Sequence, residues 1–412
     1  MTTFDPAAAT AQWLATLSPE ETARAVAYTQ GSHWLILWSF LVSALVAWII
    51  VRSNWLVAIR DRMERRRRRP LLTSFVAALV YGAMSWVLTL PWAIYESWWR
   101  EKQYGLTSQA FGGWLTEALI AAAISVVITS LLLVAIYALI RRARRWWWAW
   151  AAAVTAVFMI IGLIVSPILI EPIFNTYTPA PDGPVRDAVV ALAQETGTPS
   201  DKIYIYDGSR QSDRYTANVS GLFGSARVAM SDVMFQKGAD IAEVKGVVGH
   251  EMGHYVRMHV LWMVGVLIVV AALAFWLTDR LYPLGRRLLG AHRTGDISDP
   301  AGLPVLGLVL ALLGVLGTPV FATMTRTMEA DADHFSLVHA NAPDGLAKAL
   351  VKTAEYRAPS PSAIEEFLFY DHPSVENRVR RAMEWKAAHP ETGAPAGEAR
   401  QPRLRTNTVP AE

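Results

Sequence analysis

Two histidines and a glutamate in one short stretch are the strongest chemical signal in the sequence. His250 and His254 stand four positions apart in GHEMGHYV, so on a helix both imidazoles project from one face and can hold one metal ion. Glu251 follows the first histidine and can reach a water molecule on that ion, as a general base does in metal-assisted hydrolysis. A helix with two histidines at a membrane interface is the alternative. Because the chain has no cysteine, any metal must be held by histidine and carboxylate side chains.

A third ligand is available in an acidic cluster further along the chain. In TRTMEADADHF, Glu329 and Asp333 are four positions apart and would share one helix face, whereas Asp331 points elsewhere. A catalytic zinc ion usually takes three protein ligands and leaves a fourth position for water. Glu329 can complete such a set, while Asp333 accepts a hydrogen bond from the second ring nitrogen of a ligand histidine. A solvated acidic cap on a helix is the alternative for this cluster.

The elements that must position these residues include segments for a lipid bilayer. Hydrophobic residues are 53% of the 412 and charged residues only 18%, which is too apolar for an ordinary soluble domain. A spanning helix needs about 20 consecutive apolar residues. Six runs have this length, approximately at 33–52, 71–95, 114–140, 146–170, 258–280 and 302–325. If the last two form an antiparallel hairpin, Glu329 returns to the membrane face where the histidines lie, and His259 is expected to turn away from the ligands.

Positive charge is concentrated in a few loops, although the net charge is only +3. The basic segments are 52–70, 141–145 and 279–293. Short arginine-rich loops stay in the cytoplasm, so the N-terminus, residues 171–257 and residues 326–412 are predicted to lie outside it. In a chain this apolar, the arginine run does not favour nucleic-acid binding.

The residues outside the apolar runs predict a small α+β unit. Residues 182–197 repeat apolar side chains at helical spacing and end on glycine, which indicates an amphipathic helix. Short β-type runs at 202–207 and 225–232 indicate two strands. Asp240 is a plausible N-cap for the helix with the two histidines. The tail from residue 387 is rich in proline, glycine and charge, which is typical of disorder.

Several motifs, in order, resemble the zinc-dependent CAAX prenyl endopeptidases of type 1 and the related HtpX-like membrane proteases. The resemblance extends from about residue 75 to 385. Its motifs are LPWAIYESWWREKQYGLTSQAFGGWL, IEPIFNTYTPAPDGPVRDAVVALA, DGSRQSDRYTANVSGLFGSARVAMSDVM, HEMGH, the E-x-x-x-D from Glu329 to Asp333, and DHPSVENR. The resemblance implies one zinc ion per chain, held by His250, His254 and Glu329, with Glu251 as the catalytic acid and base.

The same resemblance assigns roles to four further residues. Ala217 and Asn218 would border the substrate cleft, where an extended peptide could add to the strand edge. His372 would stabilise the developing oxyanion. Arg378 would pair with an acidic group near the metal, in the outer shell to which Asp333 also belongs. As an alternative, His372 and Arg378 only hold the C-terminal segment through caps or salt bridges.

The implied fold is mainly α and integral to the membrane: about six transmembrane helices enclose a chamber and carry a zincin-like α+β domain with a small sheet. The expected parts are a leader (1–32), a four-helix membrane region (33–170), the first part of the metalloprotease domain (171–257), a membrane hairpin (258–325), the second part of that domain (326–386) and a disordered tail (387–412). Eukaryotic members of the family have seven spans. Because this chain has six spans, one fewer, its catalytic face is predicted to lie on the opposite side of the membrane from theirs. Together with the arginine-rich loops, this predicts an extracytoplasmic catalytic face in the cell membrane.

These features predict an integral-membrane zinc metalloendopeptidase that cleaves membrane-associated or lipid-modified, CAAX-type polypeptides. The expected partners are a peptide or protein substrate and membrane lipid, without nucleic acid. Two alternatives stay open, namely an HtpX-like quality-control protease and a non-catalytic transporter or scaffold with structural zinc. A closed structural zinc site would need a fourth protein ligand, and no obvious candidate is present in the sequence.

Overall fold

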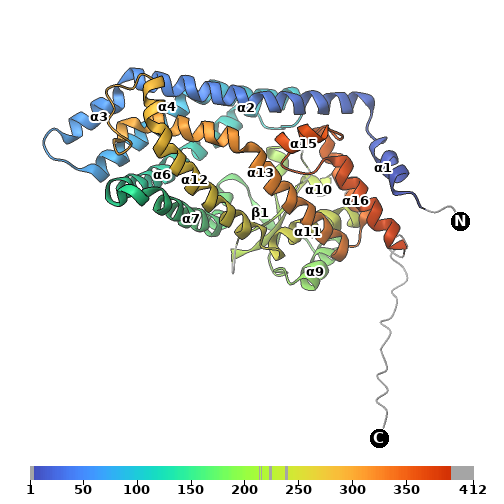
Figure 1. Cartoon of the computed structure of the whole chain (residues 1–412). Coiled ribbons are helices and arrows are strands. Elements are labelled where there is room, and N and C mark those ends of the chain that lie inside the picture. Colours follow the sequence, from blue (N-terminus) through green and yellow to red (C-terminus); the bar gives the residue numbers. More distant parts are fainter. Residues whose placement is uncertain (1–3, 213, 215, 222–224, 237–239, 391–412) are drawn as a thin grey trace, which may run out of the picture.

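Long helices form most of the protein, and a small sheet with shorter helices lies at one end (Figure 1). The computed structural model describes residues 4–212, 214, 216–221, 225–236 and 240–390. The helices are α1 (Pro6–Leu14), α2 (Pro19–Ser53), α3 (Trp55–Glu64), α4 (Pro70–Ile94), α5 (Arg100–Gln103), α6 (Phe111–Ala143), α7 (Trp147–Val165), α8 (Glu171–Phe174), α9 (Pro184–Thr196), α10 (Val233–Gln236), α11 (Ile241–Val256), α12 (His259–Leu288), α13 (Leu303–His339), α14 (Pro343–Lys352), α15 (Ala363–Phe369) and α16 (Val375–Ala388). The strands are β1 (Tyr177–Pro179), β2 (Ile203–Tyr206), β3 (Ala217–Ser220) and β4 (Arg227–Ser231).

The six predicted apolar runs lie in α2, α4, α6, α7, α12 and α13. In the described part of the chain, five helical segments are long and apolar enough to cross a membrane. The longest, Phe111–Phe174, contains both α6 and α7, which pack against each other after a break at Arg144 (φ 40°). Six runs therefore correspond to five helical segments, because one segment holds the two helices α6 and α7.

The membrane helix α2 begins well before the predicted run, inside the expected leader. The Ser18 hydroxyl accepts a hydrogen bond from the backbone N–H of Glu21, and the Glu21 carboxylate accepts one from the N–H of Ser18. This capping box, followed by Pro19 in the first turn, fixes the start of the helix. At about 1.5 Å per residue, its 35 residues are longer than the roughly 30 Å hydrocarbon layer.

The small sheet has the strand order β1-β2-β4-β3, with β2 and β4 parallel and the two outer pairs antiparallel. Both predicted strands are present as β2 and β4, and the predicted amphipathic helix is α9, which ends at Gly197 with φ +71°. Helices α9 and α11 pack on the sheet through a shared apolar core. Strand β3 lies at one edge of the sheet, and among the described residues its one partner strand is β4.

The helices α12 and α13 pack against each other, as expected for the hairpin that returns the chain to the histidines. Helix α13 continues without interruption from the apolar segment into the sheet-bearing end. At the same end, α1 packs against α16, so the N-terminal and C-terminal helices lie together (Figure 1). The tail predicted to be disordered lies mostly in residues 391–412, outside the described residues, and α16 extends to Ala388.

Candidate metal centre

Helix α11 is positioned by its N-terminal cap and by a row of glycines. Asp240 accepts a hydrogen bond from the first turn of the helix at 2.7 Å, which confirms it as the N-cap. A Cβ atom on Gly246 would lie 2.9 Å from the backbone of Leu346 in α14, and one on Gly253 would lie 3.1 Å from Cα of Ala332 in α13. Glycine therefore lets α11 approach both helices closely enough for its side chains to meet those of α13.

Three side chains converge where α11 meets α13. Nε2 of His250 lies 3.1 Å from Nε2 of His254. The carboxylate of Glu329 places Oε2 at 3.2 Å from Nε2 of His250 and Oε1 at 3.3 Å from Nε2 of His254. Two nitrogens and a carboxylate thus surround one point, although Glu329 is 75 residues beyond His254 in the sequence.

The geometry of this donor set fits zinc. Tetrahedral ligands at about 2.0–2.1 Å from the ion are separated by roughly 3.3 Å, which matches the spacing of the three donors. Oε2 of Glu329 is buried and accepts no hydrogen bond of suitable geometry from the described residues, although Nε2 of His250 and Nε2 of His372 each lie 3.2 Å from it. A buried carboxylate oxygen without a partner is costly, and a cation at this point would satisfy it. When bound there, zinc supplies a Lewis acid that polarises a carbonyl group and acidifies water.

Asp333 and Arg378 support the first histidine from behind. Oδ1 of Asp333 lies 2.9 Å from Nδ1 of His250, so this carboxylate accepts the second ring N–H, as predicted. Arg378 donates two hydrogen bonds of 2.7 Å to Asp333. Burial lowers the pKa of His250, but Asp333 and Glu329 outweigh burial and raise that pKa to about 10. The pKa of Arg378 is also raised, because the effect of Asp333 and Glu329 exceeds that of burial.

The second histidine has a support that the sequence reasoning missed. The prediction that His259 turns away was wrong, because α11 ends and Met258 adopts a left-handed conformation (φ 54°) before α12 begins. The break places Nδ1 of His259 at 3.0 Å from Nδ1 of His254, and Nε2 of His259 at 3.1 Å from Asp331. Asp331 does point away from the donor set, but it orients the ring that contacts His254. Residues 255–258 include no glycine, asparagine or proline, so the sequence gives no signal for this break in the helix.

A cavity of about 200 Å³ lies beside the donors. Its lining includes Glu251, His372, Arg378, Thr216 and Ala217. Burial raises the pKa of Glu251. His372 has Nε2 at 3.2 Å from Oε2 of Glu329. The predicted base, the predicted oxyanion stabiliser and the donor set therefore face one space.

His372 is also held from its other side. Its Nδ1 lies 2.8 Å from Oδ1 of Asp371. Burial lowers the pKa of His372, partly opposed by Asp371 and Glu329. The aspartate immediately before the histidine thus fixes the ring orientation in the cavity.

The predicted cleft residues lie on the edge strand. Ala217 lines the cavity. Asn218 follows it in β3, and its buried Oδ1 has no hydrogen-bond partner within the described residues. An extended chain could pair with the free edge of β3, which would place its backbone beside the donors.

Membrane-length helices and a two-histidine, one-glutamate donor set define a membrane-bound zinc metallopeptidase. The sequence model of Peptidase family M48 matches residues 179–386, and that of the CAAX prenyl protease N-terminal region, with five membrane helices, matches residues 7–176. The chain belongs to peptidase family M48, and it is a multi-pass membrane metalloprotease.

Individual relatives agree with this assignment. The chain is 26% identical to the uncharacterized metalloprotease YhfN of Bacillus subtilis, over 89% of this chain and 86% of that protein. It is 27% identical to a CAAX prenyl protease 1 homolog of Arabidopsis thaliana, over 73% of this chain and 71% of that protein. The crystal structure of S. mikatae Ste24p superposes with a TM-score of 0.68 over 89% of each chain at 20% identity, so the two proteins share the fold.

Replacing His259 with alanine is expected to weaken zinc binding about 10- to 100-fold, the usual effect of losing an outer-shell partner of a ligand histidine. The ring of His254 would lose the group that fixes its Nδ1. Zinc affinity should be measured by competition with a chromogenic chelator. Asp331→Asn, which keeps the size of the side chain, should give a smaller loss. Unchanged affinity in His259→Ala would contradict the assigned support.

Proposed function

We propose that the protein is an endopeptidase for membrane-associated or lipid-modified polypeptides, including CAAX-type prenylated chains. The observation that carries this proposal is the donor set of His250, His254 and Glu329 facing one cavity with Glu251. One relative, from Saccharomyces cerevisiae, is named CAAX prenyl protease 1, and another, from Arabidopsis thaliana, is named CAAX prenyl protease 1 homolog. These names support prenylated polypeptides as the substrate class. In the alternative function, an HtpX-like quality-control protease, the same site cleaves unfolded membrane proteins.

The proposed roles follow from where the side chains lie. Glu251 accepts a proton from water as the water oxygen adds to the peptide carbonyl carbon, and it gives this proton to the amine nitrogen as the C–N bond breaks. His372 donates from Nε2 to the carbonyl oxygen as negative charge develops, in the protonated form that Asp371 at Nδ1 favours against the effect of burial on its pKa. The edge of β3 at Ala217 and Asn218 aligns the substrate backbone.

The test uses purified protein and two fluorogenic peptides of the same sequence, one farnesylated at a CAAX cysteine and one not. We expect cleavage of the farnesylated peptide, loss of cleavage after zinc chelation and recovery when zinc is restored. Equal cleavage of both peptides, together with cleavage of an unfolded membrane protein, would favour the quality-control role. Failure to cleave any of these substrates with zinc bound would contradict the enzyme proposal and support a scaffold or transporter.

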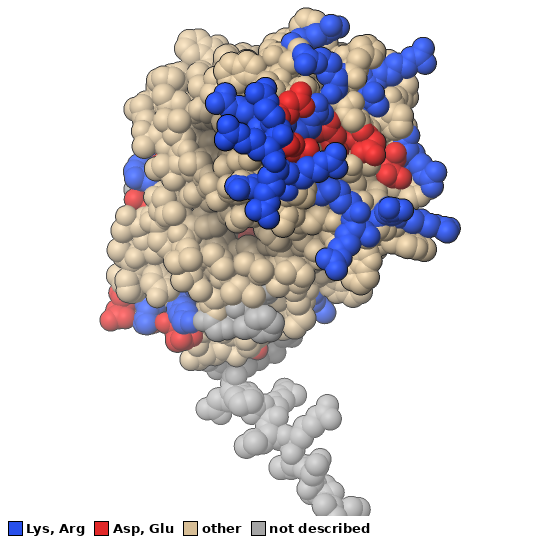
Figure 2. Space-filling model, turned by 90° about the vertical axis from the view of Figure 1, so that its left-hand side faces the viewer, with Lys and Arg blue, Asp and Glu red and all other residues tan. Residues whose placement is uncertain are grey.

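We further propose that the protein lies in the cell membrane with its catalytic end outside the cytoplasm. Figure 2 shows basic side chains gathered on the end of the molecule that carries α3. This basic end surrounds a cavity of about 970 Å³ whose lining includes Arg62, Arg65, Arg66, Arg67, Arg69 and Arg293. The sheet and α1 lie toward the opposite end (Figure 1). Arginine-rich loops favour the cytoplasmic side, and this preference supports the proposed orientation.

The orientation can be tested without background labelling because the chain has no cysteine. Asp201→Cys lies in the sheet-bearing part and Arg66→Cys at the basic end, both at exposed positions. In intact cells, a membrane-impermeant maleimide is expected to label only Asp201→Cys, and Arg66→Cys should react after permeabilisation. The reverse pattern would place the catalytic end in the cytoplasm.

A further inference from the structure

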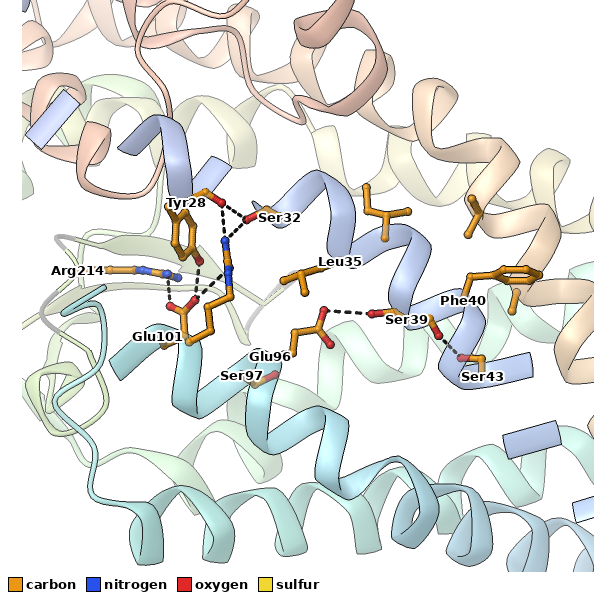
Figure 3. A pocket seen from close by; sticks show the side chains of 14 residues that line it. Tyr28, Ser32, Leu35, Ser39, Phe40, Ser43, Glu96, Ser97, Glu101 and Arg214 are labelled. Atoms are coloured by element: carbon orange, nitrogen blue, oxygen red, sulfur yellow. Dashed lines mark hydrogen bonds and ion pairs between the residues drawn. The ribbon is translucent and has the colours of Figure 1, made fainter. Parts of the chain in front are cut away.

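A second, larger cavity lies among the membrane helices. It has a volume of about 750 Å³ and is bounded by α2, by the helical segment 70–103 and by α13 (Figure 3). Although these segments are apolar, much of the lining is polar, namely Tyr28, Ser32, Ser39, Ser43, Glu96, Ser97, Arg100, Glu101 and Arg214. A polar lining inside a membrane region indicates a space for water or for a polar ligand.

Most of the charged groups in this cavity hold one another. Glu101 accepts hydrogen bonds from the Tyr28 hydroxyl at 2.5 Å and from Arg214 at 2.7 Å. Arg100 is buried, donates to the carbonyl oxygen of Tyr28 and to Ser32, and lies over the Tyr28 ring at 3.9 Å from its centroid. Both arginines are thus committed to this network, as the dashed lines in Figure 3 show.

Glu96 stands outside the network. In the described part of the chain its carboxylate has one hydrogen-bond partner, the hydroxyl of Ser39 at 3.3 Å, and no ion pair. That hydroxyl also accepts a hydrogen bond from the indole N–H of Trp92 at 2.9 Å. Figure 3 shows Glu96 and Ser39 directed toward each other across the cavity. A carboxylate in a membrane segment is costly unless it is paired or faces a functional cavity.

This cavity adjoins the catalytic one. Arg214 lines the large cavity, and Thr216, two residues later, lines the catalytic cavity, so their Cα atoms are at most about 7 Å apart. A third cavity of about 170 Å³ shares Ser32 with the large cavity and Tyr356 with the catalytic one. A polypeptide that lies in the catalytic cavity can therefore continue toward Glu96.

We propose that Glu96 forms a subsite for a lysine or arginine side chain of the polypeptide substrate, located away from the scissile bond. The proposal rests on the proposed function, since it assumes that a polypeptide occupies the cavity. A cationic side chain there would supply the ion pair that Glu96 lacks, and a hydrogen bond to a charged group in such a site contributes more than one between neutral groups.

The test compares Glu96→Gln with wild type on matched peptides. The peptides have the sequence of the farnesylated fluorogenic peptide, with all other charges removed. Each carries a single lysine, moved through successive positions, or glutamine at the same position. Wild type should have the lowest KM when the lysine is at one particular position of the peptide. For the peptide with lysine at that position, Glu96→Gln should raise KM by about tenfold with kcat unchanged. For the glutamine peptides, it should change neither constant. Glu384→Gln, the same substitution at an exposed position of α16 outside this lining, is the control and should match wild type.

Equal effects of Glu96→Gln on lysine and glutamine peptides, or no preference for lysine in wild type, would overturn the subsite. Binding of the same fluorescent peptides to Glu251→Gln protein gives a second measurement that does not require hydrolysis. If no peptide is cleaved but Glu96 still selects lysine in binding, the proposed function fails and the subsite stands. If peptides are cleaved without selection for lysine, the proposed function stands and the subsite fails.

Discussion

Replacing Glu251 with glutamine is expected to lower kcat/KM for peptide cleavage by about 10²–10⁴-fold, the usual contribution of a positioned general base. Glutamine has nearly the same shape, so α11 should keep its packing against α13 and α14. The donors are His250, His254 and Glu329, none of which is changed, so zinc content should stay at one ion per chain. Cleavage of the farnesylated fluorogenic peptide measures kcat/KM, and metal analysis of the same sample measures the zinc content.

The matched control is Glu384→Gln, the same substitution at an exposed position of α16. It should keep both zinc and activity. If Glu251→Gln cleaved peptides at the wild-type rate with zinc bound, another group would have to be the base. If it lost zinc together with activity, Glu251 would act mainly in holding the metal site.

The features that the sequence predicted correctly are those with a local pattern. Apolar runs of bilayer length are visible in any window, and they lie in α2, α4, α6, α7, α12 and α13. The four-residue spacing of His250 and His254, like that of Glu329 and Asp333, needs only a continuous helix. The two pairs meet over a long sequence distance because the last two spans form a hairpin, in which α13 is one helix that runs from the membrane segment into the site.

The features that the sequence did not predict depend on interruptions and on distant neighbours. Helical periodicity directed His259 away from the donors, but the left-handed residue Met258 ends α11 and resets the direction of the chain. Strand β1 has only three residues, too few for alternation to be recognised. The surroundings of Glu96 come from three membrane segments, so no single window of sequence shows that its carboxylate has no ion pair among the described residues.

Replacing Arg378 with methionine is expected to lower the free energy of unfolding by about 3–5 kcal/mol, because it removes the buried guanidinium that donates two hydrogen bonds to the carboxylate of Asp333. Asp333 is only 1% exposed and receives both hydrogen bonds of the guanidinium. Zinc affinity should also fall, since Asp333 orients His250. Arg378→Lys keeps the charge but not the paired geometry, so its losses should be smaller. Unfolding of the metal-free proteins and zinc competition measure the two effects separately. A methionine variant as stable as wild type would show that Asp333 is neutral or otherwise compensated, and the support assigned to Arg378 would then be wrong.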